Sequence, residues 1–114
     1  MTNLTVSKKL FREDEFTTGV ELALDGELLY EDAQTFMREI TEMAKGCGKK
    51  VLLDMGRLRY IDSSGLGAIL YISEALRMQG QKLFICKANK GNMRVLKTIN
   101  KVGTFVLEGT EEKE

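Results

Sequence analysis

Residues 51–79 read VLLDMGRLRYIDSSGLGAILYISEALRMQ, and this stretch predicts the fold class. Its first three residues form the continuous apolar run that is typical of a central strand buried on both faces, and Asp54 is expected to end that strand. After a connector over residues 55–60, the cluster at residues 61–67 leads into a helix that extends to about Gln79. A strand followed by a long helix indicates a β-α-β unit and a largely parallel sheet.

The C-terminal side continues the alternation of strands and helices. Gly80 stops the helix, and residues 83–86 form a second all-apolar strand. Asn89 is suited to cap a following helix, and residues 105–107 predict a short last strand. The remaining residues, 108–114, are expected to form a frayed tail.

The N-terminal side predicts a hairpin and one helix. Residues 4–10 and 20–24 alternate apolar and polar side chains, as half-buried strands do, and a polar turn over residues 12–15 joins them. Asp25 and Gly26 are expected to close the second strand. From Tyr30 onward, apolar residues recur at helical spacing and predict a core-facing side. The opposite side, expected to be solvated, carries Glu31, Asp32, Arg38, Glu39 and Glu42.

Together these elements predict one α/β domain over residues 1–114, with a mixed sheet of four to five strands and about three to four helices. The first two strands can pair as a hairpin, and those after residue 51 are expected to be largely parallel. A content of 43% hydrophobic and 30% charged residues is in the usual range for one globular core.

Charge and hydropathy exclude several classes of partner. Lysine plus arginine equals aspartate plus glutamate at 17 each, so the overall field gives no reason to expect nucleic acid or an anionic membrane. No apolar run comes near the roughly 20 residues that span a bilayer, and residues 1–10 lack the order of a signal peptide. We therefore expect a cytoplasmic protein without membrane insertion.

The chain contains no histidine, which removes most familiar catalytic arrangements. Serine or cysteine nucleophiles activated by histidine, phosphohistidine relays and histidine metal sites are all excluded. Cys47 and Cys86 lie far apart and show no CxxC spacing, so neither a redox motif nor a zinc site is indicated. We expect no enzyme activity, no metal and no cofactor.

The cluster Asp62-Ser63-Ser64-Gly65 carries the functional signal, because it falls between a strand and a helix. The first backbone amides of a helix lack intrahelical partners and lie at the positive end of its dipole, where a phosphate is well accommodated. Either serine could instead be a plain helix cap. Gly65 and Gly67 permit close approach of another protein, or alternatively tight packing of helix on strand.

The helix after this cluster is apolar nearly all round in its opening turns, so its apolar residues cannot all face one core. We take Leu66, Ile69 and Tyr71 as candidates for contact with a partner. The alternative is a helix sandwiched between the sheet and a neighbouring helix.

These residues resemble the STAS domains shared by anti-sigma factor antagonists and the cytoplasmic parts of sulphate transporters. The likeness covers most of the chain and rests on residues 26–28, on residues 51–54 and above all on residues 61–67. The resemblance implies that Ser64 is phosphorylated by a partner serine kinase that doubles as an anti-sigma factor, with Ser63 in a lesser role. A serine phosphatase is the implied counterpart.

The resemblance predicts a protein-binding switch. Unmodified Ser64 would lie in a docking surface for the kinase, and its phosphate would add charge where Asp62, and Asp54 as well, is already negative. Repulsion would then release the partner. Asp62 could orient the serine hydroxyl or help to deprotonate it, or it could cap the helix.

Two features depart from the family pattern. Leu29 replaces the acidic residue that usually follows Gly-Glu-Leu, which bears on phosphorylation and kinase recognition. The sequence also stops soon after Leu107, so we expect the final helix of many members to be missing or very short, and the apolar edge that this leaves would allow a homodimer.

Three alternatives remain. A receiver domain would take its phosphate on Asp54, with Glu13-Asp14 as its acidic pair and Lys101 as its lysine. A nucleotide-binding enzyme would need a third glycine at Leu70. An adaptor or scaffold of the same fold, part of a signalling or transport complex, would leave Ser64 unmodified.

Overall fold

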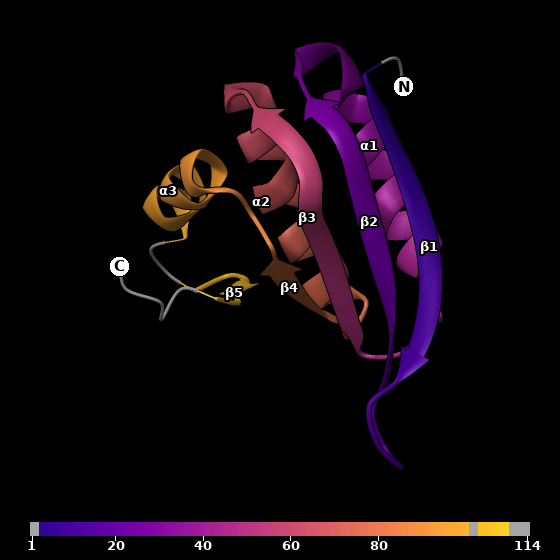
Figure 1. The fold of residues 1–114 in the computed structure, drawn as a ribbon. Coiled ribbons are helices and arrows are strands. Elements are labelled where there is room, and N and C mark those ends of the chain that lie inside the picture. The colour runs from indigo at the N-terminus through magenta and orange to yellow at the C-terminus, as the bar shows by residue number, and fades with distance from the viewer. Residues whose placement is uncertain (1–2, 101–102, 110–114) are drawn as a thin grey trace.

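The computed structural model describes residues 3–100 and 103–109 and folds them into five strands and three helices. In chain order these are β1 (Leu4–Arg12), β2 (Thr18–Leu28), α1 (Tyr30–Ala44), β3 (Lys50–Ile61), α2 (Ser63–Met78), β4 (Lys82–Cys86), α3 (Lys90–Ile99) and β5 (Val106–Leu107). The strand order is β1-β2-β3-β4-β5, with β1 antiparallel to β2 and the later pairs parallel (Figure 1). The predicted α/β class and mixed sheet are confirmed.

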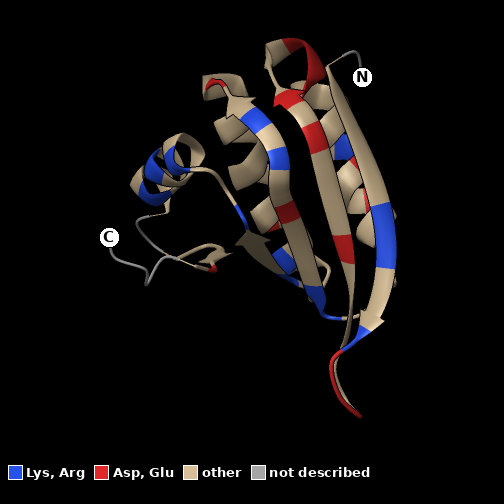
Figure 2. Ribbon diagram, in the orientation of Figure 1, with Lys and Arg blue, Asp and Glu red and all other residues tan. Residues whose placement is uncertain are grey.

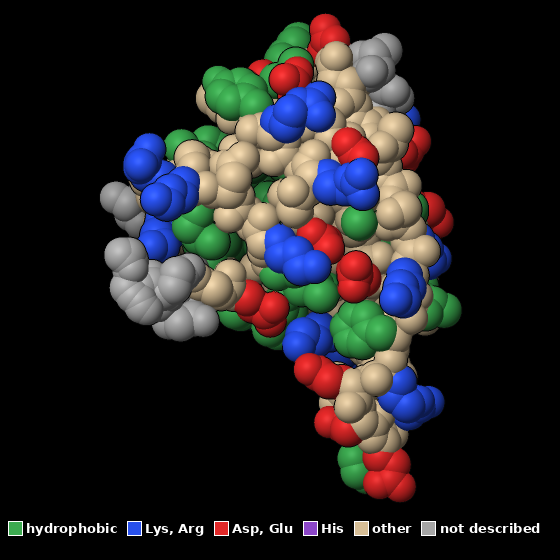
Figure 3. Space-filling model, in the orientation of Figure 1, with side chains coloured by type: hydrophobic (Ala, Val, Ile, Leu, Met, Phe, Trp, Pro, Cys, Tyr) green, Lys and Arg blue, Asp and Glu red, His purple; other side chains and the backbone are tan. Residues whose placement is uncertain are grey.

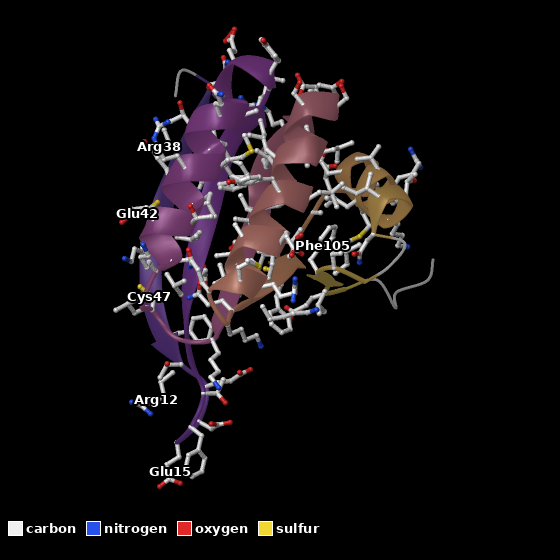
Figure 4. All side chains as sticks on the ribbon, turned by 180° about the vertical axis from the view of Figure 1, so that it is seen from behind. Arg12, Glu15, Arg38, Glu42, Cys47 and Phe105 are labelled. Atoms are coloured by element: carbon white, nitrogen blue, oxygen red, sulfur yellow. The ribbon has the colours of Figure 1, made fainter. Side chains whose placement is uncertain are left out.

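Helices α1 and α2 cover one face of the sheet, and no helix within the described residues covers the other (Figure 1; from behind in Figure 4). The strand order never reverses from β2 to β5, and right-handed crossovers in one direction place their helices on one side. In β3, Val51 and Leu53 are fully buried, whereas Leu52 between them is only half-buried. The prediction that this strand is buried on both faces is therefore wrong.

Strands β2 and β3 are longer than predicted. β2 continues through Gly26, which has a φ of +122° and where a Cβ would lie 2.1 Å from the carbonyl oxygen of Asn3. The pairing of β2 with β3 shifts register at two places near Gly26, as at a β-bulge, and the strands run on beyond it. Asp54 consequently does not end β3, and the predicted connector over residues 55–60 is strand.

The apolar sides of the helices meet the sheet in one core. α1 contributes Phe36, Ile40 and Ala44, and α2 contributes Ala68, Ile69, Ile72 and Leu76. The expectation that Asp32 lies on the solvated side of α1 is wrong. Asp32 is fully buried and accepts a hydrogen bond from Asn3 Nδ2 at 3.2 Å. Helical periodicity could not show that Asn3, which precedes β1, would bind this carboxylate.

The predicted helix ends are found in the structure. Asn89 caps α3 by accepting a hydrogen bond from the backbone N–H of Asn92 at 2.8 Å, and Gly80 follows α2 with a φ of +79°. The side-chain amide of Asn92 donates to the Leu58 carbonyl at 3.1 Å and so holds α3 against β3. The frayed-tail prediction falls largely on residues 110–114, which lie outside the described residues. Within the described ranges, α1, α2 and α3 each lack the length and apolar character that crossing a membrane requires.

Candidate functional site

The serine-containing loop lies where β3 ends and α2 begins. Asp62 is the N-cap of α2, and its Oδ1 accepts a hydrogen bond from the backbone N–H of Gly65 at 2.8 Å. Ser63 and Ser64 are therefore the first two residues of the helix and not its cap. Both lie at the positive end of the helix dipole, as the sequence led us to expect.

The carboxylate of Asp62 serves a second helix as well. Its Oδ2 accepts a hydrogen bond from the backbone N–H of Tyr30, the first residue of α1, at 2.8 Å. The N-cap of α1 is Leu29, whose side chain makes no capping hydrogen bond. One side chain thus satisfies amides of two helix N-termini and fixes them side by side. Among the hydrogen bonds of the described residues, none joins Asp62 to Ser64, so capping is the role of Asp62 that the geometry supports.

Ser64 lies in the wall of a surface pocket between the first turns of α1 and α2. Its side chain is half-buried, and the pocket has a volume of about 490 Å³. The other lining residues are Tyr30, Glu31, Ala33, Gln34, Met37, Gly67 and Ala68. The serine is therefore accessible from solvent and is not enclosed in the core.

The two glycines of the loop have different structural roles. A Cβ on Gly65 would lie 2.6 Å from the Leu28 carbonyl oxygen and 2.8 Å from Ile61 Cγ2, so this glycine allows α2 to pack tightly against the strand ends. A Cβ on Gly67 would meet nothing within 4 Å. Gly67 instead borders the pocket one helical turn after Ser64 and leaves that side of the serine open.

The apolar surface of α2 agrees only in part with the sequence expectation. Ile69 is fully buried, so the prediction that it contacts a partner is wrong. Leu66 is half-buried and packs against the core, whereas the side chains of Leu70 and Tyr71 are 36% and 55% exposed. The sandwiched-helix alternative holds for the buried residues of α2, because α1 and the sheet cover them from two sides.

The contribution of α1 to the pocket did not follow from the sequence. Tyr30 is 79% exposed at the pocket rim, and Met37 lies two helical turns further along the same side of α1. Their spacing is a helical repeat that sequence could have shown, but only the contact between α1 and α2 places them beside Ser64.

The charge around the pocket is of one sign. Glu31 lines it, Asp62 lies at the start of the same helix as Ser64, and no lysine or arginine is among the described lining residues. The Glu31 carboxylate accepts a hydrogen bond from Asn3 Nδ2 at 2.7 Å. A phosphate on Ser64 would therefore meet acidic side chains, although it would also lie at the positive end of the helix dipole.

Asp54 does not belong to this site. It lies on the uncovered face of the sheet, where its Oδ1 accepts from the Gly56 N–H at 2.8 Å and its Oδ2 lies 3.6 Å from Lys87 Nζ. Side chains alternate between the two faces of a strand, and Asp54 points to the face opposite to the one that α2 covers. The expectation that Asp54 adds negative charge beside Ser64 is therefore wrong.

The surroundings of Asp54 also argue against a receiver domain. Glu13 pairs with Lys50 at 3.0 Å, and Asp14 binds amides of its own loop, so neither forms a metal site with Asp54. Within the described residues, no three acidic, cysteine or histidine side chains come together as metal ligands. The antiparallel β1 also departs from the parallel order of receiver folds. Lys101 lies outside the described residues.

Cys86 shares the uncovered face with Asp54. Burial, together with the negative charge of Asp54, raises the pKa of the Cys86 thiol to about 11. The thiol is therefore protonated at neutral pH and is a poor nucleophile.

Known proteins share the sequence pattern and the fold of this chain. A family model described as the STAS domain matches residues 12–113. The unphosphorylated form of the anti-sigma factor antagonist SpoIIAA superposes with a TM-score of 0.60 at 21% identity, over 92% of this chain and 91% of that one. The phosphorylated form of SpoIIAA from Bacillus gives 0.59 at 18% identity, over 92% and 94%.

A transporter contains a similar domain. The murine anion transporter Slc26a9 gives a TM-score of 0.69 at 13% identity, over 92% of this chain and 20% of that one. The chain thus corresponds to about a fifth of that transporter's length. At these identities the structural matches establish the fold.

Proposed function

The chain belongs to the STAS domain family, and on that premise we propose that it is an anti-sigma factor antagonist controlled by phosphorylation of Ser64. In this proposal the unmodified protein binds an anti-sigma factor kinase in the cytoplasm, and the phosphorylated protein releases it. A serine phosphatase restores the binding form. The chain acts by binding and carries out no reaction of its own.

The observation that carries the proposal is the position of Ser64. Its side chain lies in the wall of a surface pocket, at the start of a helix, with Gly67 leaving one side open. A kinase active site needs such access to a serine hydroxyl. SpoIIAA, which has the same fold, is known in an unphosphorylated and a phosphorylated form.

A docking surface surrounds this serine. Tyr30 on α1 and Tyr71 on α2 are 79% and 55% exposed, and Ser64, Gly67 and Tyr71 follow one another along one side of α2. Aromatic side chains beside a pocket are the residue types that most often anchor a protein interface. We assign the contact with the kinase to this surface, which includes the first turns of α1 as well as α2.

The charge of the pocket explains how phosphate would cause release. Phosphorylation adds about 1.5 to 2 negative charges, and the described lining offers Glu31 but no cation to neutralise them. A docked partner would have to desolvate this charge. A loss of about 3 kcal/mol would weaken binding more than a hundredfold, without any change of fold.

Variants of the two adjacent serines test the proposal. Ser64→Ala should accept no phosphate from the cognate kinase and ATP, by intact mass, yet should bind the kinase as wild type does in calorimetry. Ser64→Asp should bind at least tenfold more weakly. Ser63→Asp is the matched control, because Ser63 is exposed and does not line the pocket. Equal binding by all four proteins would reject the charge switch.

An adaptor function is the second candidate, because Leu29 stands where the family commonly has an acidic residue and because Slc26a9 contains a domain of the same fold. In that case the same surface binds a protein permanently. The wild-type chain would then gain no phosphate with any kinase of its own organism, and Ser64→Asp would still bind its partner.

A further inference from the structure

The hairpin between β1 and β2 presents an aromatic side chain on an ordered loop. Phe16 is 90% exposed, more than any other large apolar side chain in the described residues. The Asp14 Oδ1 accepts hydrogen bonds from the backbone N–H groups of Phe16 and Thr17, both at 2.8 Å. The Arg12 guanidinium donates to the carbonyl oxygens of Asp14 and Glu15 at 3.4 and 3.1 Å. The loop is thus held in one shape with its ring in solvent.

This loop, residues 13–16, which we name the hairpin tip, is acidic. Glu13 is neutralised by Lys50, but Glu15 has no ion pair within the described residues. The hydrogen bond from the Phe16 N–H lowers the pKa of Asp14, so this carboxylate stays ionised. The tip extends beyond the body of the molecule, where Figure 4 labels Glu15. Asp14 and Glu15 therefore place negative charge beside a projecting aromatic ring, on a loop whose carbonyl oxygens bind the Arg12 guanidinium.

Helix α3 presents the complementary charge. Lys90, Arg94 and Lys97 recur at helical spacing opposite the buried Asn92 and Leu96, and no acidic residue occurs between Lys90 and Ile99. None of the three cations forms an ion pair with a described residue. Half-buried Met93 and Val95 flank the row of cations. We name this surface the basic face of α3.

The hairpin tip and the basic face lie far apart on one molecule: in Figure 2 the red tip projects at the bottom and the blue helix lies at the left side of the body. They cannot meet within one chain. We propose that they meet between two copies, with the hairpin tip of one molecule docked on the basic face of α3 of the next. The Phe16 ring would pack beside Arg94, an arrangement that a guanidinium favours, and Glu15 would face the neighbouring lysine.

The geometry sets the form and strength of the assembly. The contact joins two different surfaces, so it builds head-to-tail chains or a closed ring and not a two-fold dimer. One loop on one helix is a small interface, and its charges are exposed, so association is weak and sensitive to salt. This proposal uses neither Ser64 nor its pocket, and it stands or falls separately from the proposed switch.

Sedimentation velocity on the full chain tests the proposal. At low ionic strength the weight-average mass should rise above that of the monomer between about 10 μM and 1 mM protein, and 0.5 M NaCl should abolish the rise. Phe16→Ser, Glu15→Lys and the double variant Arg94→Glu/Lys97→Glu should each remain monomeric. These side chains are exposed, so the variants should match wild type in circular dichroism and thermal unfolding.

A mixing experiment identifies the two surfaces. Glu15→Lys keeps a native basic face, and Arg94→Glu/Lys97→Glu keeps a native hairpin tip, so a 1:1 mixture of these two monomeric variants should associate again. A wild-type protein that stays monomeric at 1 mM, or a mixture that stays monomeric, would overturn the proposal.

A second control concerns the acidic C-terminal residues Glu111, Glu112 and Glu114. Changing all three to glutamine should leave the association intact or strengthen it. Loss of association in that variant would show that the C-terminal residues, and not the hairpin tip, supply the negative charge, and would also overturn the proposal.

Discussion

The two faces of the sheet differ in how their surface charge is balanced. On the uncovered face, positive and negative side chains are interleaved (Figure 3). Its ion pairs are Arg57–Asp25, Lys87–Asp54 and Lys50–Glu13, with N–O distances of 3.4, 3.6 and 3.0 Å. Around the pocket on the helical side, the charge is acidic and aromatic rings are exposed. An added phosphate would be one charge among many on the uncovered face, but it would be the dominant charge around the pocket.

Some residues near the pocket and on the uncovered face hold the structure together, and others leave space for a partner. Gly65 lets α2 pack against the ends of β2 and β3, and Asp62 joins the N-termini of α1 and α2 at the pocket. A Cβ on Gly67 would meet nothing within 4 Å, and the Arg57–Asp25 ion pair on the uncovered face is exposed at both ends, so the fold does not depend on either. Mutations in the two groups should therefore change the free energy of unfolding by different amounts.

The largest effect is expected at Gly65. Alanine there would place its Cβ 2.6 Å from the Leu28 carbonyl oxygen, and this overpacking should lower the free energy of unfolding by about 3 kcal/mol. Gly67→Ala is the matched control and should raise it by about 0.5 to 1 kcal/mol, because alanine favours helix and meets no neighbour there. Urea unfolding measures both. Equal effects at the two glycines would contradict the described packing.

The next effect is expected at Asp62. Asp62→Ala removes hydrogen bonds to the first turns of two helices and should lower the free energy of unfolding by about 2 kcal/mol. Asp62→Asn keeps one acceptor oxygen, so about half of that loss is expected. If the alanine and asparagine variants proved equally stable, the double capping role would be refuted.

A smaller effect is expected at Arg57 on the uncovered face. Its ion pair with Asp25 is exposed at both ends, so Arg57→Ala should change the free energy of unfolding by no more than about 0.5 kcal/mol. The change should also shrink further in 0.5 M salt. A loss comparable to that of Asp62→Ala would show that the uncovered face is not merely solvated.

The smallest effect is local and depends on pH. The pKa of Asp14 is lowered in the folded protein, so the hydrogen bonds from Phe16 and Thr17 are fully present above the pKa of an ordinary aspartate. They are lost as pH falls through the lowered value. The amide signals of both residues should titrate together below about pH 4 in NMR spectra, and Asp14→Ala should remove this titration. Amide signals that stay constant down to pH 2 would contradict the loop geometry.

Local sequence patterns predicted much of the fold and the central residue of the site. The strand, the polar cluster and the helix around Ser64 follow from residues adjacent in sequence, and so do the Asn89 cap and the stop at Gly80. Strand length was harder to predict, because β2 and β3 continue past Gly26 and Asp54 through an irregular register that depends on their pairing.

Most failed expectations depend on contacts between distant segments. The apolar run around Leu52 predicted a strand buried on both faces, yet α1 and α2 both cover the other face and leave Leu52 half-buried (Figure 1). Ile69 was assigned to a partner because α2 is apolar all round, but α1 and the sheet together bury it. The bond from Asp62 to Tyr30 spans 32 residues, and no local pattern specifies it.

In the proposed switch, the charge on the Ser64 oxygen decides whether the partner stays bound. The most direct measurement is calorimetric titration of the cognate kinase, held with a non-hydrolysable ATP analogue, against unmodified protein and against protein phosphorylated stoichiometrically at Ser64. We predict a dissociation constant at least a hundredfold higher for the phosphorylated protein, restored by phosphatase treatment. Equal affinities for the two forms would contradict the account.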